Sequence, residues 1–192
     1  MEKTSAKIIL FDRAMELFRK NGYDNVTIQQ ICSEANVTRN AFYYYFDSKE
    51  ALLSSYFENI PNFTETLLAN VLALPNDWEK LWYLFEAHLR LVENEGLSIC
   101  RAFMKVNIDG NGEFLTKYYV SETVTIPLLC SCQNSGLIRN MMEPSQLIYL
   151  ATRMMAGIML AWCCKNGEFD LISNSKEAFR VLLSPVENDR QA

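Results

Sequence analysis

Glycine and proline are scarce in this chain of 192 residues, which contains seven glycines and five prolines. Hydrophobic residues recur with helical spacing along the sequence, and the apolar–polar alternation that is typical of strands is missing. Because 49% of the residues are hydrophobic, the chain is able to fill a sizeable core. The sequence therefore predicts an all-α protein.

Histidine is scarcer still, because His88 is the only one. The sequence also lacks a glycine-rich phosphate-binding loop, an HExxH motif and a GxSxG motif. A Cys–His mechanism would require Cys100 or another thiol beside His88, and no spacing in the sequence supports that arrangement. We therefore predict that the protein is not an enzyme and uses no cofactor.

Positive charge is in short supply, since the formal net charge is −5, which by itself argues against a nucleic-acid partner. The distribution of the charges changes that conclusion. Residues 1–50 contain seven Lys or Arg and seven Asp or Glu, whereas the rest of the chain contains 11 and 16. The first part is neutral and is therefore not excluded from binding a polyanion.

A secretory signal and a long apolar run are also missing. The first ten residues mix both charges, and Asp12 follows before any long apolar run. The longest such run, residues 154–164, is shorter than the roughly 20 residues that cross a bilayer. We therefore expect a cytoplasmic protein without a membrane partner, whose six cysteines are reduced thiols.

Two close pairs of cysteines, Cys130 with Cys132 and Cys163 with Cys164, invite a reading as metal ligands or redox sensors. Residues one or two positions apart on a helix point in different directions, so neither pair readily shares one metal. A zinc-type CxxC with a histidine partner is absent. We predict no metal site, and metal or thiol sensing stays an alternative.

Three short helices are predicted within the first 47 residues. The first has one apolar face and stops at Gly22. The second begins at Thr27, which forms a capping-box pattern with Gln30, and ends where Asn36 suits a left-handed position. Thr38 is able to cap the third, residues 39–46. Two short helices joined by a tight turn form the outline of a helix-turn-helix.

The stretch TIQQICSEANVTRNAFYYYFDSKEALL, residues 27–53, resembles the DNA-binding signature of TetR-type transcriptional regulators. The residues in step with that signature are Ile31, Ala35, Val37, Phe46, Lys49, Glu50 and Leu52. The preceding AMELFRKNGYDNVTI matches the family's first helix and Gly-Tyr turn, so the resemblance covers about the first 55 residues. It implies a helix-turn-helix DNA-binding domain over residues 1–55, with the motif at about 27–46. A larger helical domain for effector binding and dimerisation would cover residues 56–192.

The third helix contains three consecutive tyrosines. At about 100° per residue, Phe42 and Phe46 share one side, while Tyr43 and Tyr44 share the opposite side. We predict that the phenylalanines face the core and these tyrosines face solvent. The resemblance then implies DNA contacts, with the tyrosine hydroxyls on phosphates and Arg39 and Asn40 on bases. The predicted DNA-binding residues are Thr27, Thr38, Arg39, Asn40, Ala41, Tyr43, Tyr44 and Lys49.

Simpler readings exist for the same residues. The exposed tyrosines would also suit a protein-interaction patch, and Thr27 and Thr38 would be helix caps even without a phosphate. Ala41, Asn40, Asn36 and Cys32 depart from the common family pattern, which leaves the operator sequence open.

Longer helices are predicted near residues 48–59, 62–73, 77–94, 97–108, 113–135, 144–166 and 174–184. Pro127 should kink or break the fifth of these. The helix at 144–166 is apolar almost all round, so it needs partners on all sides. The resemblance implies that it and the last helix pair with their copies in a homodimer, through Met154, Met155, Ile158, Trp162, Phe179, Leu182 and Leu183. The alternative is a central helix in a monomer.

The middle helices are rich in aromatic and methionine side chains, which suit a mostly apolar small molecule. The resemblance implies an effector pocket there, and the candidate lining residues are Trp82, Phe85, His88, Phe103, Met104 and Tyr119. Ordinary core packing is the alternative for each of them. Together these features predict a ligand-responsive transcriptional regulator, a repressor released from a pseudo-palindromic operator in double-stranded DNA by a small-molecule effector. A helical small-molecule or protein-binding module that has lost operator binding is the runner-up.

Overall fold

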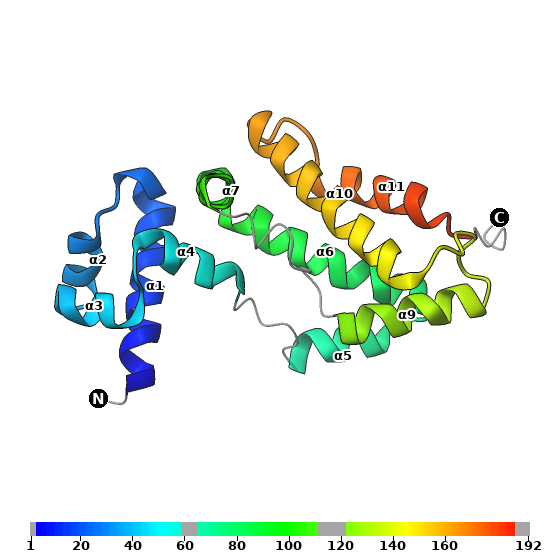
Figure 1. Ribbon diagram of the computed structural model, residues 1–192, viewed down its shortest axis with the longest axis horizontal. Coiled ribbons are helices and arrows are strands. Elements are labelled where there is room, and N and C mark those ends of the chain that lie inside the picture. Colours follow the sequence, from blue (N-terminus) through cyan, green and yellow to red (C-terminus); the bar gives the residue numbers. More distant parts are fainter. Residues whose placement is uncertain (1–2, 59–64, 111–121, 187–192) are drawn as a thin grey trace. The chain divides into compact units, whose positions relative to one another are not determined.

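The computed structural model describes residues 3–58, 65–110 and 122–186, and within these ranges every regular element is a helix (Figure 1). One isolated antiparallel bridge joins Ile138 to Pro185. The predicted all-α class is therefore confirmed. In chain order the elements are α1 (Lys3–Asn21), the 3-10 turn η1 (Tyr23–Asn25), α2 (Ile28–Glu34), α3 (Arg39–Tyr45), α4 (Lys49–Glu58), α5 (Glu65–Ala73), α6 (Asp77–Glu95), α7 (Leu97–Asp109), α9 (Glu122–Asn134), α10 (Pro144–Cys164) and α11 (Leu171–Leu183).

The chain folds as two compact units. The first contains Met1–Ile60 together with Asn94–Phe114, and the second contains Pro61–Glu93 together with Leu115–Ala192. The predicted DNA-binding segment, residues 1–55, therefore shares its unit with α7. Sequence patterns could not assign α7 to that unit, because it follows the segment by some 40 residues of other helices.

The core of the first unit forms where the apolar faces of its helices meet. Leu10 and Phe18 of α1, Ile31 of α2, Phe42 of α3 and Leu52 of α4 are all fully buried. Helix α7 packs against α1, α4 and η1. A bidentate ion pair supports this packing, in which the guanidinium of Arg19 donates to both carboxylate oxygens of Glu95 at 2.8 Å. Helix α7 thus joins α1, α4 and η1, while α2 packs on α1 and α3 packs on α2.

The ends of the short helices are set by local signals that the sequence shows. Thr27 and Gln30 form the predicted capping box around the start of α2. Asn36 has φ 52°, the left-handed conformation that the turn between α2 and α3 requires. The hydroxyl of Thr38 accepts a hydrogen bond from the backbone N–H of Ala41 and caps α3. The predicted helix-turn-helix is therefore confirmed in its geometry.

The second unit is organised around an aromatic cluster between α6 and α11. Phe179 of α11 is fully buried, and its ring lies 4.9–5.6 Å from the rings of Trp78, Trp82 and Phe85 on α6. These three side chains follow each other at helical spacing, so they form one face of α6. Helix α10 packs against both α9 and α11 (Figure 1).

Two boundary predictions need correction. Helix α9 continues through Pro127, so of the expected kink or break the break does not occur. The last helix begins at Leu171 rather than 174, because the carboxylate of Asp170 accepts a hydrogen bond from the N–H of Ser173 and caps an earlier turn. The parts predicted as helix at 62–64 and 113–121 lie outside the described residues.

Helix α10 is long and apolar enough to cross a membrane by length and composition alone, with a mean hydropathy of 1.6 over its most apolar window. The uninterrupted apolar run of residues 154–164 is only part of this 21-residue helix. Half of that window is buried inside the protein, as in the core helix of a soluble protein. The contacts of α10 with α9 and α11 supply that burial.

The single histidine makes the stability of the fold depend on pH. Burial lowers the pKa of His88 to about 4. Because this value lies below the unfolded value of about 6.5, the stability that neutral His88 contributes is complete above pH 6.5 and is lost as the pH falls towards 4. We expect a loss of about 3 kcal/mol over that window. Denaturant unfolding measures the free energy of unfolding of wild type and of His88→Gln. The difference between the two should become smaller by this amount as the pH falls from 6.5 to 4. Parallel pH profiles would contradict it.

Candidate nucleic-acid interface

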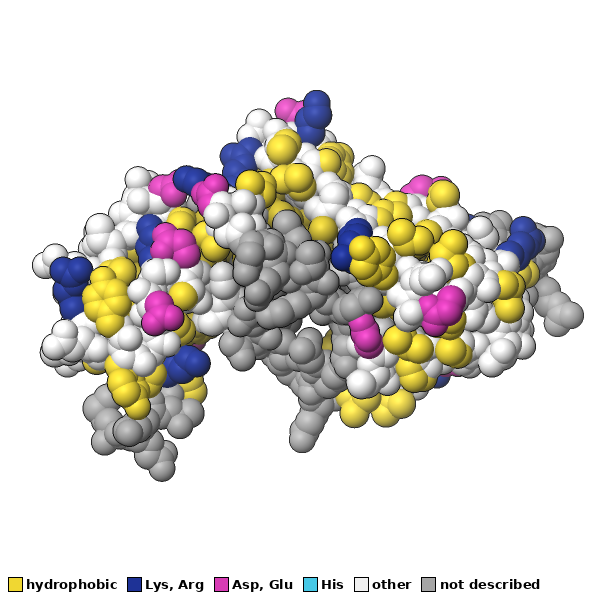
Figure 2. All heavy atoms as spheres, in the orientation of Figure 1, with side chains coloured by type: hydrophobic (Ala, Val, Ile, Leu, Met, Phe, Trp, Pro, Cys, Tyr) yellow, Lys and Arg dark blue, Asp and Glu magenta, His cyan; other side chains and the backbone are white. Residues whose placement is uncertain are grey.

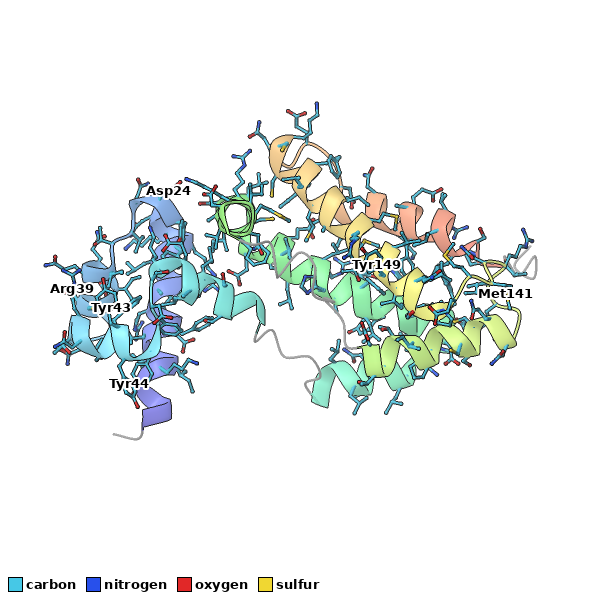
Figure 3. The ribbon with its side chains drawn as sticks, viewed as in Figure 1. Asp24, Arg39, Tyr43, Tyr44, Met141 and Tyr149 are labelled. Atoms are coloured by element: carbon cyan, nitrogen blue, oxygen red, sulfur yellow. The ribbon has the colours of Figure 1, made fainter. Side chains whose placement is uncertain are left out.

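Helix α3 presents its tyrosines to solvent. Tyr43 and Tyr44 are 45% and 66% exposed, whereas Phe42 and Phe46 are buried. Figure 3 shows the labelled side chains Arg39, Tyr43 and Tyr44 on the outer side of this helix. The predicted division of α3 into a phenylalanine face and a tyrosine face is therefore confirmed. An exposed pair of large aromatic side chains on a short helix is accessible to a partner.

Arg39 lies beside Tyr43, one helical turn apart. Its guanidinium carbon is 6.0 Å from the centre of the Tyr43 ring, and one of its nitrogens is 3.5 Å from the hydroxyl oxygen. Arg39 and Asn40 are exposed, and Ala41 is half-buried. The long guanidinium and the short amide thus stand on the surface that carries the two tyrosines. The guanidinium offers donors, and the amide offers both donors and an acceptor, which are the groups that read base edges.

The hydroxyls of Thr27 and Thr38 lie at the starts of α2 and α3. Thr27 accepts a hydrogen bond from the backbone N–H of Gln30, and its hydroxyl is 2.9 Å from the side-chain oxygen of Gln30. Both threonines accept capping hydrogen bonds, and both are exposed, so they remain accessible to a partner. The prediction that they also contact phosphate stays a prediction.

Lys49 has partners that sequence reasoning did not foresee. Its ammonium donates to the backbone carbonyls of Tyr23 and Val26, both at 2.9 Å. It also lies 4.1 Å from the centre of the Tyr23 ring. Those carbonyls belong to the turn before α2, more than 20 residues earlier. Only a pattern linking these distant positions could have revealed the contact.

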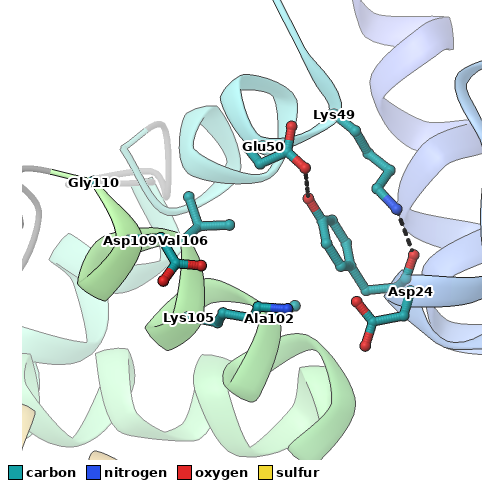
Figure 4. A pocket seen from close by; sticks show the side chains of 9 residues that line it. Asp24, Lys49, Glu50, Ala102, Lys105, Val106, Asp109 and Gly110 are labelled. Carbon is teal, nitrogen blue, oxygen red and sulfur yellow. Dashed lines mark hydrogen bonds between the residues drawn. The ribbon is translucent and has the colours of Figure 1, made fainter.

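A cavity of about 480 Å³ opens beside this cluster, entirely within the first unit (Figure 4). The hydroxyl of Tyr23 donates to Glu50 across it at 3.1 Å. Burial, followed by the charge of Glu50, raises the pKa of Tyr23. Burial acts to raise the pKa of Glu50, but hydrogen bonds from its own backbone, Ser48 and Tyr23 and the charge of Lys49 outweigh it and lower that pKa. The cavity is lined by Tyr23, Asp24, Lys49, Glu50, Ala102, Lys105, Val106, Asp109 and Gly110.

The six candidate effector-binding residues belong to different parts of the chain. Trp82, Phe85 and His88 are buried on α6 in the second unit. Phe103 and Met104 are buried on α7 in the first unit, and Tyr119 lies outside the described residues. The structure brings Trp82 and Phe85 together around Phe179. Phe179, which the family resemblance predicts for the dimer interface, is fully buried in this cluster.

The buried polar atoms of the second unit that lack a hydrogen-bond partner within the part of the chain that the structure describes include the indole nitrogen of Trp82 and the hydroxyl oxygen of Ser175. Ser175 lies one turn before Phe179 on α11 and is fully buried. A buried donor without a partner lowers the stability of the fold by about 1–3 kcal/mol. An oxygen atom of a ligand or water that accepted its hydrogen bond would remove this cost.

The predicted dimer residues divide into two groups. Met155, Trp162, Phe179 and Leu183 are already buried in the single chain, so they belong to its own core, whereas Met154, Ile158 and Leu182 are half-buried. A helix that is apolar all round does not show from sequence which side its own subunit covers. The exposed apolar side chains on these two helices are Tyr149, Leu150, Leu160 and Val181. Figure 2 shows hydrophobic side chains gathered over α10.

The cysteines carry no disulfide among the described residues. Burial, assisted by the charge of Asp77, raises the pKa of Cys132 to about 12, so this thiol stays protonated and unreactive at neutral pH. Cys163 is buried, and its neighbour Cys164 is exposed. No group of three or more His, Cys, Asp or Glu in the described ranges is able to hold a metal ion.

The family model described as "Bacterial regulatory proteins, tetR family" matches residues 10–56, which span the helix-turn-helix. This chain therefore has the DNA-binding domain of the TetR family over residues 10–56. TetR-family proteins are transcriptional regulators rather than enzymes, which confirms that prediction. Their helix-turn-helix binds DNA, so the exposed face of α3 is the candidate DNA-reading surface.

Similarity to known proteins over the whole length of the chain is lower than over this motif. The chain is 38% identical over 69 residues to the HTH-type transcriptional regulator YuxN of Bacillus subtilis, a match that covers 36% of this chain and 23% of that protein. It is 22% identical over 184 residues to the fatty acid metabolism regulator protein of B. subtilis, covering 93% and 94%. The structure of Thermus thermophilus FadR with lauroyl-CoA superposes with a TM-score of 0.73, at 21% identity, over 97% and 98% of the two chains.

Removal of one tyrosine hydroxyl tests the α3 face. Tyr43→Phe keeps the ring and should weaken operator binding by about 1.5 kcal/mol per half-site, the scale of one hydrogen bond to a charged group. The loss should be equal on operator and random DNA, because phosphate contacts do not read sequence. Arg39→Ala should instead reduce discrimination between sequences. Fluorescence anisotropy measures both, with Tyr45→Phe as the control. Wild-type affinity in Tyr43→Phe would remove this tyrosine from the interface.

Proposed function

We propose that this TetR-family protein is a homodimeric repressor that leaves its operator when a mostly apolar small molecule binds the second unit. The exposed surface formed by Arg39, Tyr43 and Tyr44 carries the DNA-binding half of the proposal. Each surface reads one half-site of a pseudo-palindrome, so two subunits are needed for a full operator. Effector binding selects a state in which the two recognition helices are wrongly spaced.

The dimer would use the outer side of α10 and α11. These two helices carry four large, exposed apolar side chains, which are Tyr149, Leu150, Leu160 and Val181. Gly157, on the same side of α10, has open space around it, so a partner helix could approach closely. The core residues beneath, such as Met155 and Phe179, would fix the orientation of this surface without touching the partner.

Fatty acyl-CoA thioesters are the effector class that we propose to test first. Two proteins similar to this chain over most of its length support this choice by name, the fatty acid metabolism regulator of B. subtilis and FadR with lauroyl-CoA. The buried aromatic cluster around Phe179 is the kind of surface that holds an acyl chain. The indole N–H of Trp82 and the hydroxyl of Ser175 are buried donors that would suit a carbonyl oxygen.

The test is an anisotropy titration of DNA that flanks the protein's own gene, with lauroyl-CoA or with CoA alone. Saturating lauroyl-CoA should lower the affinity for this DNA at least tenfold, and CoA should not. By linkage, the DNA-bound dimer must bind lauroyl-CoA more weakly by the same factor. Specific binding that lauroyl-CoA leaves unchanged would reject the effector class. Absence of specific binding by the wild type would favour the alternative, a helical module that has lost its operator.

Trp82→Phe refines this test. It removes the indole donor and keeps an aromatic ring against Phe179. We expect lauroyl-CoA to bind about tenfold more weakly, the scale of one hydrogen bond to a buried donor, while operator binding without effector stays near normal. Trp78→Phe is the matched control, because the Trp78 ring also stacks on Phe179 but its nitrogen is not among the unpartnered buried atoms. Equal effects of the two changes would show that the Trp82 donor does not bind the effector.

A further inference from the structure

Lys49 is the first residue of α4, and its ammonium is held by the turn before α2. An ammonium has three N–H donors. Two of them bond the carbonyls of Tyr23 and Val26 at 2.9 Å each, and the Tyr23 ring covers the group at 4.1 Å. The ring is itself fixed, because the Tyr23 hydroxyl donates to Glu50 (Figure 4).

The Val26 carbonyl connects this cluster to the DNA-binding surface. It shares one planar peptide unit with the backbone N–H of Thr27. That N–H donates to the side-chain oxygen of Gln30 at 2.8 Å. The carbonyl, at the opposite edge of the same peptide unit, accepts from the ammonium of Lys49. The two contacts together fix the rotation of the peptide unit. The direction in which the Thr27 side chain leaves the backbone is therefore set from α4.

We propose that Lys49 is a positioning residue that orients Thr27 for phosphate contact, and is not itself a phosphate ligand. The proposal rests on the proposed DNA binding. It reverses the role that the sequence resemblance implied for this lysine. Two of the three N–H donors are held by backbone carbonyls, so a phosphate oxygen could use only the third donor or would have to displace one of those carbonyls.

The salt dependence of DNA binding separates the two roles. A lysine that neutralises a phosphate contributes about 0.9 to the slope of log K against log salt, or about 1.8 for a dimer. We expect Lys49→Met to weaken binding to the flanking DNA at least tenfold while changing that slope by less than about 0.5. Lys49→Arg keeps the charge, but its planar fork does not reproduce two bonds from one nitrogen. It should therefore weaken binding as well, with an unchanged slope.

A double-mutant cycle tests the connection to Thr27, using the full-length protein well below its melting temperature. Thr27→Val should weaken DNA binding in the wild-type background and cost nothing more in the Lys49→Met background. Thr38→Val is the matched control, because Thr38 caps α3 in the same way but its peptide unit does not touch Lys49. Its cost should be the same in both backgrounds, which a general loss of folding would not produce.

Several results overturn the proposal while leaving DNA binding intact. One is wild-type affinity in Lys49→Arg combined with a slope reduced by about 2 in Lys49→Met, which identifies a phosphate ligand. Another is full additivity of Thr27→Val and Lys49→Met. If the wild type itself fails to bind the flanking DNA specifically, the proposed function falls, and this proposal falls with it.

Discussion

Leu160→Glu should convert the proposed dimer into a monomer and abolish operator binding. Leu160 is 39% exposed in the single chain and lies on the outer side of α10. By the symmetry of a homodimer, the substitution places two carboxylates in one apolar interface. Burying an unpaired charge costs several kcal/mol, so dimer dissociation should become more than a hundredfold easier. Sedimentation velocity at micromolar concentration measures this directly.

Leu72→Glu is the control for that experiment. Leu72 is 70% exposed on α5, outside the proposed interface, so the same substitution there should leave the dimer intact. The circular dichroism of Leu160→Glu should match that of wild type, because the side chain is not part of the core. A wild-type protein that sediments as a monomer, or a Leu160→Glu variant that stays dimeric and binds operator, would refute the proposed interface.

Phe179→Ala should destabilise the second unit by about 3–5 kcal/mol, the range for removing a buried phenylalanine. The ring is fully buried among Trp78, Trp82 and Phe85, so its removal leaves a cavity that three aromatic neighbours border. Val181→Ala, two residues later at a side chain that is 72% exposed, should change the free energy of unfolding of the single chain by less than about 0.5 kcal/mol.

This change also separates a core role from an interface role for Phe179. A core residue lowers the melting temperature by a similar amount at every protein concentration. A residue that acts only in the dimer lowers it in a way that depends on concentration, because subunit association is linked to folding. Thermal unfolding at 1 µM and at 100 µM distinguishes the two cases. A loss of stability that occurs only at the higher concentration would show that Phe179 acts in the dimer interface.

The fold of the first unit was predictable because its signals are local. The pair Thr27 and Gln30, the left-handed Asn36 and the cap Thr38 each act within a few residues, and the structure has all of them as predicted. The division of α3 into a buried and an exposed face follows from helical periodicity alone. Pro127 shows the limit of such rules, since the surrounding helix continues through it.

The remaining features depend on contacts between distant residues. Sequence alone could not show that Met155 and Phe179 face their own core, because this depends on how α6, α10 and α11 pack. The partners of Lys49 lie 26 and 23 residues away in the chain, so periodicity gave no sign of them. Trp82 and Ser175, whose donors have no partner among the described residues, likewise become visible only once burial is known.

The central claim is that two copies of α3 read an operator and release it when an effector binds. Footprinting of the wild-type protein on the DNA that flanks its own gene tests this most directly. The account predicts two protected half-sites on one face of the duplex, separated by about one helical turn or a multiple of it. Lauroyl-CoA should remove this protection. Arg39→Ala should reduce the difference in protection between the half-sites and the neighbouring DNA. Protection that is no stronger than on random DNA, at any protein concentration and without effector, would contradict the account.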